Sequence, residues 1–137
     1  MPLNLEDATR VIQKAQARAI DLGVRVCVAI VDEGGHLIAL SRMDGASPLS
    51  PQIAESKAVG TAMLLREGGA LEQLAQDRPG FFNAIDRMVR VPLIPGPGSV
   101  VITRGGKCVG AIGISGARPE QDLDCAEVGL TSLGEPA

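Results

Sequence analysis

The chain has 137 residues, of which 45% are hydrophobic, with two Phe, no Tyr, no Trp, one His and a formal net charge of −3. This length and apolar content predict a single domain over residues 1–137, with a core that needs no disulfide or metal. The scarcity of aromatic residues and the acidic balance exclude nucleic-acid-binding modules that stack bases or neutralise phosphates. One histidine also excludes a His-rich metal centre, so no metal ligands are predicted.

Nothing in the sequence predicts a membrane segment or a targeting signal. No apolar run approaches the roughly 18 residues that a membrane-spanning helix needs. The first residues lack the basic and apolar regions of a signal peptide. We therefore expect a cytoplasmic protein that binds neither membrane nor nucleic acid. In that reducing compartment Cys27, Cys108 and Cys125 are expected to be free, mostly buried thiols.

The first third of the chain predicts a helix followed by a β-hairpin. Apolar residues recur at steps of three and four over residues 5–22, with Asn4 as a suitable N-cap and Gly23 as a stop. Residues 24–32 and 36–42 then alternate in the manner of strands and are separated by a Glu-Gly-Gly turn.

The remainder predicts further helices and a second hairpin. A helix starts at Ser50 followed by Pro51, with Pro at the favoured first helical position, and a short helix follows over residues 70–78. Residues 81–99 are rich in Pro and Gly and predict an irregular crossing loop. Residues 100–115 predict the second hairpin, and a last helix runs over residues 119–133. Two hairpins covered by helices indicate an α+β fold with an antiparallel sheet.

Lys57 stands out because it lies within the apolar arc of its helix, between Ile53 and Thr61. A lysine in such a position extends its ammonium group to solvent, pairs with an acid or faces a ligand. The functional alternative is an anchor for a carboxylate, or a base.

Two acids, Glu120 and Asp122, lie in the first turn of the last helix, after a Gly-rich strand end. They complement the helix dipole and would repel a phosphate, and the glycine spacing differs from a dinucleotide-binding motif. Both acids are explained by helix capping. Asp122 also lies at the edge of the buried stripe, so it is a candidate to face a cleft.

Three further residues lie at the ends of the first hairpin. Arg42 and Asp44 are two apart and share a face, which indicates either a local ion pair or an Arg fork for a ligand carboxylate. His36 lies beside the turn, where it is either a solvated surface residue or a ligand.

Three stretches together resemble a known family. They are VAIVDEGGHLIALSRMDGA at 28–46, the SKAxxTA pattern at 56–62 and VGAIGISGARPEQDLDCAEVGL at 109–130. These motifs resemble the GlcG/HbpS family, which also includes the C-terminal domain of PduO-type proteins. The resemblance covers about residues 5–133.

The resemblance implies a five-stranded antiparallel sheet flanked by helices, similar to profilin-like and PAS-like domains. It implies homo-oligomers built on dimers, up to octamers, and a ligand pocket between helices and sheet near the subunit interface. Some members bind haem. The positions that match the family motifs are Asp32, Gly34, Gly35, Arg42, Asp44, Lys57, Thr61, Gly110, Gly113, Ser115, Gly116, Glu120 and Asp122.

This sequence departs from PduO-like domains because its first helix has no histidine to ligate a haem iron. Axial ligation would therefore fall to His36, Met43 or a cysteine.

We thus expect a small-ligand-binding protein of the GlcG/HbpS type, with haem as the candidate cofactor. Its predicted ligand-binding residues are His36, Arg42, Asp44, Thr61, Ser115 and Gly116.

Two alternatives stay open, and with them the question whether the chain is an enzyme. The first is a cofactor-independent isomerase or lyase acting on a small carboxylated metabolite. In it, Lys57 and Arg42 hold the acid, and Glu120 or Asp122 moves a proton. The catalytic residues would then be Lys57, Glu120 and Asp122. The second alternative is a non-catalytic oligomeric assembly domain.

Overall fold

A computed structural model describes residues 1–134 of the chain. The elements are α1 (Leu5–Leu22), β1 (Cys27–Asp32), β2 (Leu37–Arg42), α2 (Ser50–Leu64), α3 (Gly68–Asp77), α4 (Pro79–Asp86), β3 (Ser99–Arg104), β4 (Lys107–Ser115), α5 (Pro119–Leu130) and a 3-10 turn over Thr131–Leu133.

The strands form one antiparallel sheet in the order β2-β1-β4-β3. The two hairpins are therefore joined through their β1 and β4 strands, and β2 and β3 lie at the edges. Cys27 of β1 pairs with Arg42 on one side and with Ser115 on the other. This register places these three residues in one row across one end of the sheet.

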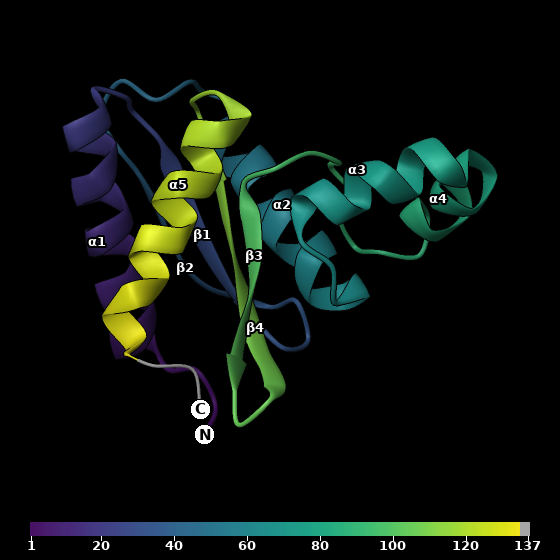
Figure 1. Cartoon of the computed structure of the whole chain (residues 1–137), viewed down its shortest axis with the longest axis horizontal. Coiled ribbons are helices and arrows are strands. Elements are labelled where there is room, and N and C mark those ends of the chain that lie inside the picture. The colour runs from purple at the N-terminus through teal and green to yellow at the C-terminus, as the bar shows by residue number, and fades with distance from the viewer. Residues whose placement is uncertain (135–137) are drawn as a thin grey trace.

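Helices cover the two faces of the sheet unequally. In Figure 1, α1 and α5 lie side by side on one face, and α2 lies on the other. Helices α3 and α4 pack against each other and extend away from the sheet as an arm (Figure 1). The N-terminus and the end of the described chain lie close together.

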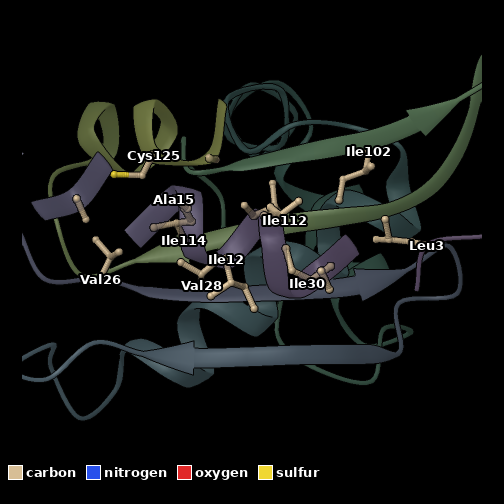
Figure 2. Packing of buried hydrophobic residues seen from close by; sticks show 14 of the residues in the cluster. Leu3, Ile12, Ala15, Val26, Val28, Ile30, Ile102, Ile112, Ile114 and Cys125 are labelled. Atoms are coloured by element: carbon tan, nitrogen blue, oxygen red, sulfur yellow. The ribbon is translucent and has the colours of Figure 1, made fainter. Parts of the chain in front are cut away.

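Alternation along the strands divides the core into two layers. Val28, Ile30, Ile112 and Ile114 face α1 and α5 and fill the larger layer, which Figure 2 shows. The intervening residues of β1 and β4 face α2 and are smaller, including Ala29 and Ala111. Both faces of the central strands are buried, as their nearly continuous apolar sequence indicates.

The first helix has the predicted limits, and its caps explain them. The Asn4 side chain accepts a hydrogen bond from the amide of Asp7 at 2.8 Å. Gly23 adopts the left-handed conformation, with φ of 73°, and ends the helix. The predictions of an α+β fold and an antiparallel sheet are confirmed, as are the two hairpins.

The prediction of five strands is wrong, because the sheet of the described chain has four. The segment before β3 contains Pro92, Pro95 and Pro97, and its Leu93 packs with Leu74 and Phe82 of the arm. Proline has no amide hydrogen to donate to a strand ladder, so this segment does not extend the sheet.

The prediction of an irregular loop over residues 81–99 is also wrong at its start, where α4 forms. Pro79 occupies the favoured first turn of this helix, and Phe82 and Ile85 pack on Leu74 of α3. Several element ends differ from expectation as well, and α3 begins at Gly68 rather than at residue 70. Strand β1 begins at Cys27 rather than at residue 24, and the last helix changes to a 3-10 turn after Leu130.

The cysteines are free, as expected, with Cys27 and Cys125 buried and Cys108 half-buried. Within residues 1–134, no helix combines the length and apolar character needed to cross a bilayer.

Candidate functional site

The structure brings Lys57 and Asp122 together in a buried ion pair. Lys57 projects from α2 and Asp122 from α5, so the pair joins helices on opposite faces of the sheet. The Lys57 Nζ lies 3.2 Å from Asp122 Oδ2, and the two side chains are only 9% and 3% exposed. The pairing explains why a lysine occupies the apolar arc of α2.

Every hydrogen of the Lys57 ammonium has an acceptor. Besides Asp122, Nζ donates to the carbonyl oxygen of Ile114 at 2.8 Å and to that of Pro97 at 3.3 Å. The second carboxylate oxygen of Asp122 accepts the amide of Ala117 at 3.1 Å. The pair therefore fastens the end of β4, the start of α5 and the 97–98 segment, and leaves no ammonium hydrogen for a ligand.

Gly98 makes this arrangement possible. A Cβ atom there would lie 2.7 Å from Lys57 Nζ and 3.1 Å from Asp122 Cβ, and the φ of this residue is +127°. Only glycine combines that conformation with so close an approach. The cluster formed by Lys57, Asp122, Pro97, Gly98 and Ile114 is called the ion-pair cluster below.

Burial raises the pKa of Asp122 above its usual value. The charge and hydrogen bond of Lys57 and the amide of Ala117 oppose this effect, whereas the charge of Glu120 adds to it. Glu120 itself is exposed and pairs with Arg118 at the surface, at 3.3 Å. Of the three predicted catalytic residues, Lys57 and Asp122 meet, and Glu120 points to solvent. This geometry gives no support to a proton-transfer centre built on all three.

The predicted ligand-binding residues do not converge on one pocket. Arg42 and Asp44 are both exposed, whereas Met43 between them points inward, with its sulfur 3.4 Å from the amide nitrogen of Val26. Ser115 is buried in the same cross-strand row as Arg42, one residue after the Ile114 carbonyl that binds Lys57.

Two other predicted positions serve internal packing. The hydroxyl groups of Thr61 and Ser99 share a buried hydrogen bond of 2.6 Å that joins α2 to β3. Gly116 has a φ of +124°, and a Cβ atom there would meet the Arg25 carbonyl oxygen at 2.6 Å. Both positions are therefore explained by the fold alone.

His36 is exposed beside the turn between β1 and β2. Asp32 Oδ1 accepts the amides of Gly34 and His36 at 2.9 and 3.0 Å and holds this turn in shape. Gly35, with a φ of +76°, lies against Met63, since a Cβ atom at Gly35 would be 3.0 Å from the Met63 sulfur.

Arg90 completes the surroundings of this turn. Its guanidinium donates to the Gly35 carbonyl at 2.9 Å and to Glu55 at 2.8 Å. Leu37 and Met63 remain 45% and 48% exposed. The surface formed by Gly35, His36, Leu37, Met63 and Arg90 is called the turn surface below. It combines an imidazole, two apolar side chains and a guanidinium.

Two cavities lie elsewhere, and none of the predicted site residues lines them. The larger, of about 710 Å³, runs along β3. Its lining residues are Met1, Asn4, Asp7, Val100, Val101, Ile102, Thr103, Arg104, Gly105, Leu130, Leu133 and Gly134. The smaller, of about 370 Å³, lies between the start of α3, Pro97, Ser99 and Leu123.

The sequence did not predict the neighbours of Lys57 or those of His36. The Pro-Gly-Pro-Gly run at 95–98 was visible, but nothing in it indicated that its backbone would enclose Lys57. Nothing in the sequence indicated that Arg90 and Met63 would lie at the turn of His36, because they reach it from distant parts of the chain.

Comparisons with known proteins place these observations in a family. The model of the family described as haem degrading protein HbpS-like matches residues 3–131. The chain is 31% identical to an uncharacterized 15.0 kDa protein from the dhaT-dhaS intergenic region of Citrobacter freundii, over 97% of this chain and 93% of that protein. It is 32% identical to the protein GlcG of Escherichia coli K12, over 82% of this chain and 81% of that protein.

Solved structures of similar proteins support the same family assignment. A PduOC–haem complex superposes with a TM-score of 0.88 at 26% identity, covering 98% of this chain and 96% of that one. HbpS superposes with a TM-score of 0.88 at 29% identity, covering 98% and 92%. The chain belongs to the HbpS-like family, as the motifs at 28–46, 56–62 and 109–130 predicted.

Proposed function

We propose that this protein binds haem and that His36 is the ligand of the haem iron. The observation that carries the proposal is the likeness, over almost the whole of both chains, to a structure described as a haem complex. The family description, which refers to haem degradation, points to the same ligand.

The donor atoms of this chain narrow the choice of iron ligand. His36 is the only histidine in the sequence, and its side chain is exposed. Cys27 and Cys125 are buried, and burial raises the pKa of each thiol to about 11, so both stay protonated at neutral pH. The Met43 sulfur packs inward against the amide of Val26. The thiol of the half-buried Cys108 donates to the Gly110 carbonyl oxygen at 3.4 Å. The exposed imidazole of His36 is therefore the most accessible of the three kinds of donor expected.

The turn surface suits the rest of a haem. A porphyrin has broad apolar faces and two carboxylates. Leu37, which follows the turn, and Met63, which lies against Gly35, offer exposed apolar side chains. Arg90, which already pairs with Glu55 at 2.8 Å, donates to the carbonyl of Gly35 at 2.9 Å, one residue before His36, and has further N–H groups for a carboxylate. When bound, the iron would supply redox and ligand-binding chemistry. The residues of this chain bind and orient it at the surface.

Titration with haemin tests the proposal. The wild-type protein is expected to shift the Soret band at micromolar concentration, and His36→Ala is expected to lose that shift and regain it on addition of imidazole. Lys107→Ala, which removes an exposed cation from the first residue of β4, is the control and should bind like wild type. No spectral shift with wild-type protein would overturn haem binding. An unchanged shift with His36→Ala would overturn only the assignment of the iron ligand.

A further inference from the structure

The smaller cavity, of about 370 Å³, lies at the start of α3 and is called the α3 cavity below. Gly69 and Ala70 of the first helical turn line it, as does Ser99, the first residue of β3. Arg66, in the short connection between α2 and α3, also contributes to the lining. None of these four residues belongs to the turn surface, so the α3 cavity is a separate feature of the molecule.

The first amides of α3 are hydrogen-bond donors in need of acceptors. The amide of Leu71 donates to the Glu67 carbonyl at 2.9 Å, whereas within residues 1–134 the amides of Gly69 and Ala70 have no acceptor. No side chain caps this helix, and its first turn contains no acidic residue. The two amides therefore lie at the uncompensated positive end of the helix dipole, beside the cavity.

A buried hydroxyl hydrogen is the second, independent sign of a ligand. Ser99 is 1% exposed and Thr61 is fully buried, and their hydroxyl oxygens are 2.6 Å apart. Two hydroxyl groups carry two hydrogens, and the bond between them uses one. The part of the chain that the structure describes offers no acceptor for the other. Because Ser99 lines the cavity and Thr61 does not, the unused hydrogen is satisfied when Thr61 donates to Ser99 and Ser99 donates to a ligand.

The hydroxyl and the helix start lie close together. A Cβ atom at Gly68, the first residue of α3, would be 2.9 Å from Ser99 Oγ. The amide of Gly96 donates to the Gly68 carbonyl at 3.0 Å and fixes the segment before β3 against the helix. The donors of α3 and of Ser99 are thus held side by side by the fold before any ligand arrives.

The charges around the cavity fit an anion that carries one charge. Arg66, exposed at the rim, supplies a guanidinium, and Glu67 supplies one carboxylate. The guanidinium and the helix dipole attract an anion, whereas the Glu67 charge opposes a second negative charge on it. Leu65, Pro97 and Leu123 line the remainder and provide apolar contact. A short aliphatic chain that ends in a carboxylate matches this lining.

We propose that the α3 cavity binds a small aliphatic monocarboxylate. The carboxylate oxygens accept hydrogen bonds from the amides of Gly69 and Ala70 and from the Ser99 hydroxyl, and Arg66 supplies the counter-charge. The aliphatic part of the ligand lies against the apolar side of the cavity. This site shares no residue with the turn surface, so it does not depend on the binding of haem there.

Titration of the wild-type protein with sodium propionate, followed by NMR, tests the proposal. The amide resonances of Gly69 and Ala70 should shift along a saturable curve, with a Kd below about 10 mM in about 0.1 M chloride. Inorganic phosphate at about pH 8, where it is mainly a dianion, should bind at least about tenfold more weakly. No saturable shift of these amides with propionate overturns the proposal, and so does phosphate binding as tight as that of propionate.

Two variants of Ala70 provide the second arm. Ala70 is exposed in the first turn of α3, where a glutamate complements the helix dipole, so Ala70→Glu should be at least as stable as wild type. It also places a negative charge at the cavity, and propionate is expected to bind at least about tenfold more weakly. Ala70→Gln has the same shape without the charge and should lose no more than about threefold. Equal affinities of the two folded variants for propionate overturn the proposal.

Two arginine variants test the counter-charge. Arg66→Gln removes the guanidinium at the cavity, whereas Arg87→Gln removes an exposed guanidinium at the end of α4. Propionate should bind at least about threefold more weakly to Arg66→Gln and as tightly to Arg87→Gln as to wild type. Circular dichroism checks that both variants are folded. Equal affinities of Arg66→Gln and Arg87→Gln overturn the proposed binding mode.

Discussion

Lys57 and Asp122 join two helices that lie on opposite faces of the sheet. The two side chains meet beside Gly98, the residue just before β3. Their charged atoms are 3.2 Å apart, and both side chains are buried. Charges removed from water are costly unless they are paired and hydrogen-bonded, and here both conditions are met. The pair therefore links the helices that cover the two faces of the sheet.

Breaking this pair from one side is expected to destabilise the protein strongly. Asp122→Leu leaves the Lys57 ammonium buried without its counter-charge, which should lower the free energy of unfolding by about 3–5 kcal/mol. The double variant Lys57→Met/Asp122→Leu removes both charges and should recover most of that loss. Urea denaturation of the two variants measures the difference. A double variant as unstable as Asp122→Leu alone would show that the pair stabilises the fold by more than mutual compensation.

Substitution of Gly98 is expected to disturb the same cluster from the backbone. Gly98→Ala would place a methyl group 2.7 Å from Lys57 Nζ, in a backbone conformation that only glycine adopts easily. We expect a loss of about 1–3 kcal/mol of unfolding free energy.

The control for this substitution is Gly69→Ala, in the first turn of α3. A Cβ atom at Gly69 meets no heavy atom within 4 Å, and its φ is outside the left-handed region. Alanine is also the better helix former, so this variant should be as stable as wild type or slightly more so. Thermal unfolding followed by circular dichroism ranks the two variants, and equal losses would contradict the steric explanation.

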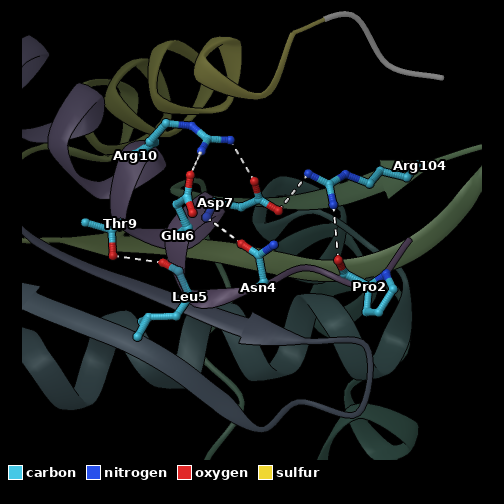
Figure 3. Close-up of polar contacts among 8 residues, drawn as sticks. All are labelled: Pro2, Asn4, Leu5, Glu6, Asp7, Thr9, Arg10 and Arg104. Carbon is cyan, nitrogen blue, oxygen red and sulfur yellow. Dashed lines mark hydrogen bonds and ion pairs between the residues drawn. The ribbon is translucent and has the colours of Figure 1, made fainter.

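Acid is expected to weaken the contact between α1 and β3. Burial by itself raises the pKa of Asp7, but hydrogen bonds from Arg104, the Asn4 backbone and Arg10, with the charge of Arg104, outweigh it and hold the pKa below its usual value. A carboxyl group with a lowered folded pKa contributes stability above its unfolded pKa of about 3.9, and that stability disappears as the pH falls through the folded pKa. The contribution of Asp7, whose contacts Figure 3 shows, should therefore be present at pH 7 and decrease as the pH falls below the unfolded pKa of about 3.9.

Asp7→Asn tests this dependence. The variant should be about 1–2 kcal/mol less stable than wild type at neutral pH, and the difference should vanish in acid. Glu6→Gln, one residue earlier in the same helical turn, is the control, because Glu6 is 84% exposed and forms only a surface pair with Arg10. Unfolding midpoints across this pH range give the comparison, and a difference for Asp7→Asn that persists unchanged in acid would refute the assignment.

The local sequence pattern was sufficient to predict most helices and strands of this protein. The three- and four-residue spacing of α1 with its Asn4 and Gly23 caps, and the alternation of both hairpins, follow from interactions between residues near in sequence. The motifs at 28–46, 56–62 and 109–130 were likewise enough to identify the family. The position of Lys57 in an apolar arc also indicated correctly that the residue needed an explanation.

The partners of Lys57 were determined only by the tertiary structure. Asp122 is 65 residues away in sequence, and the Pro97 carbonyl is 40 residues away. No periodicity encodes such contacts, because they depend on where the helices of opposite faces lie relative to the sheet. The same is true of the exposed Glu120, of Arg90 beside His36 and of the cavity at the start of α3. Sequence alone determined which residues could carry chemistry or charge, and packing decided that the buried pair serves the fold and that the turn faces outward.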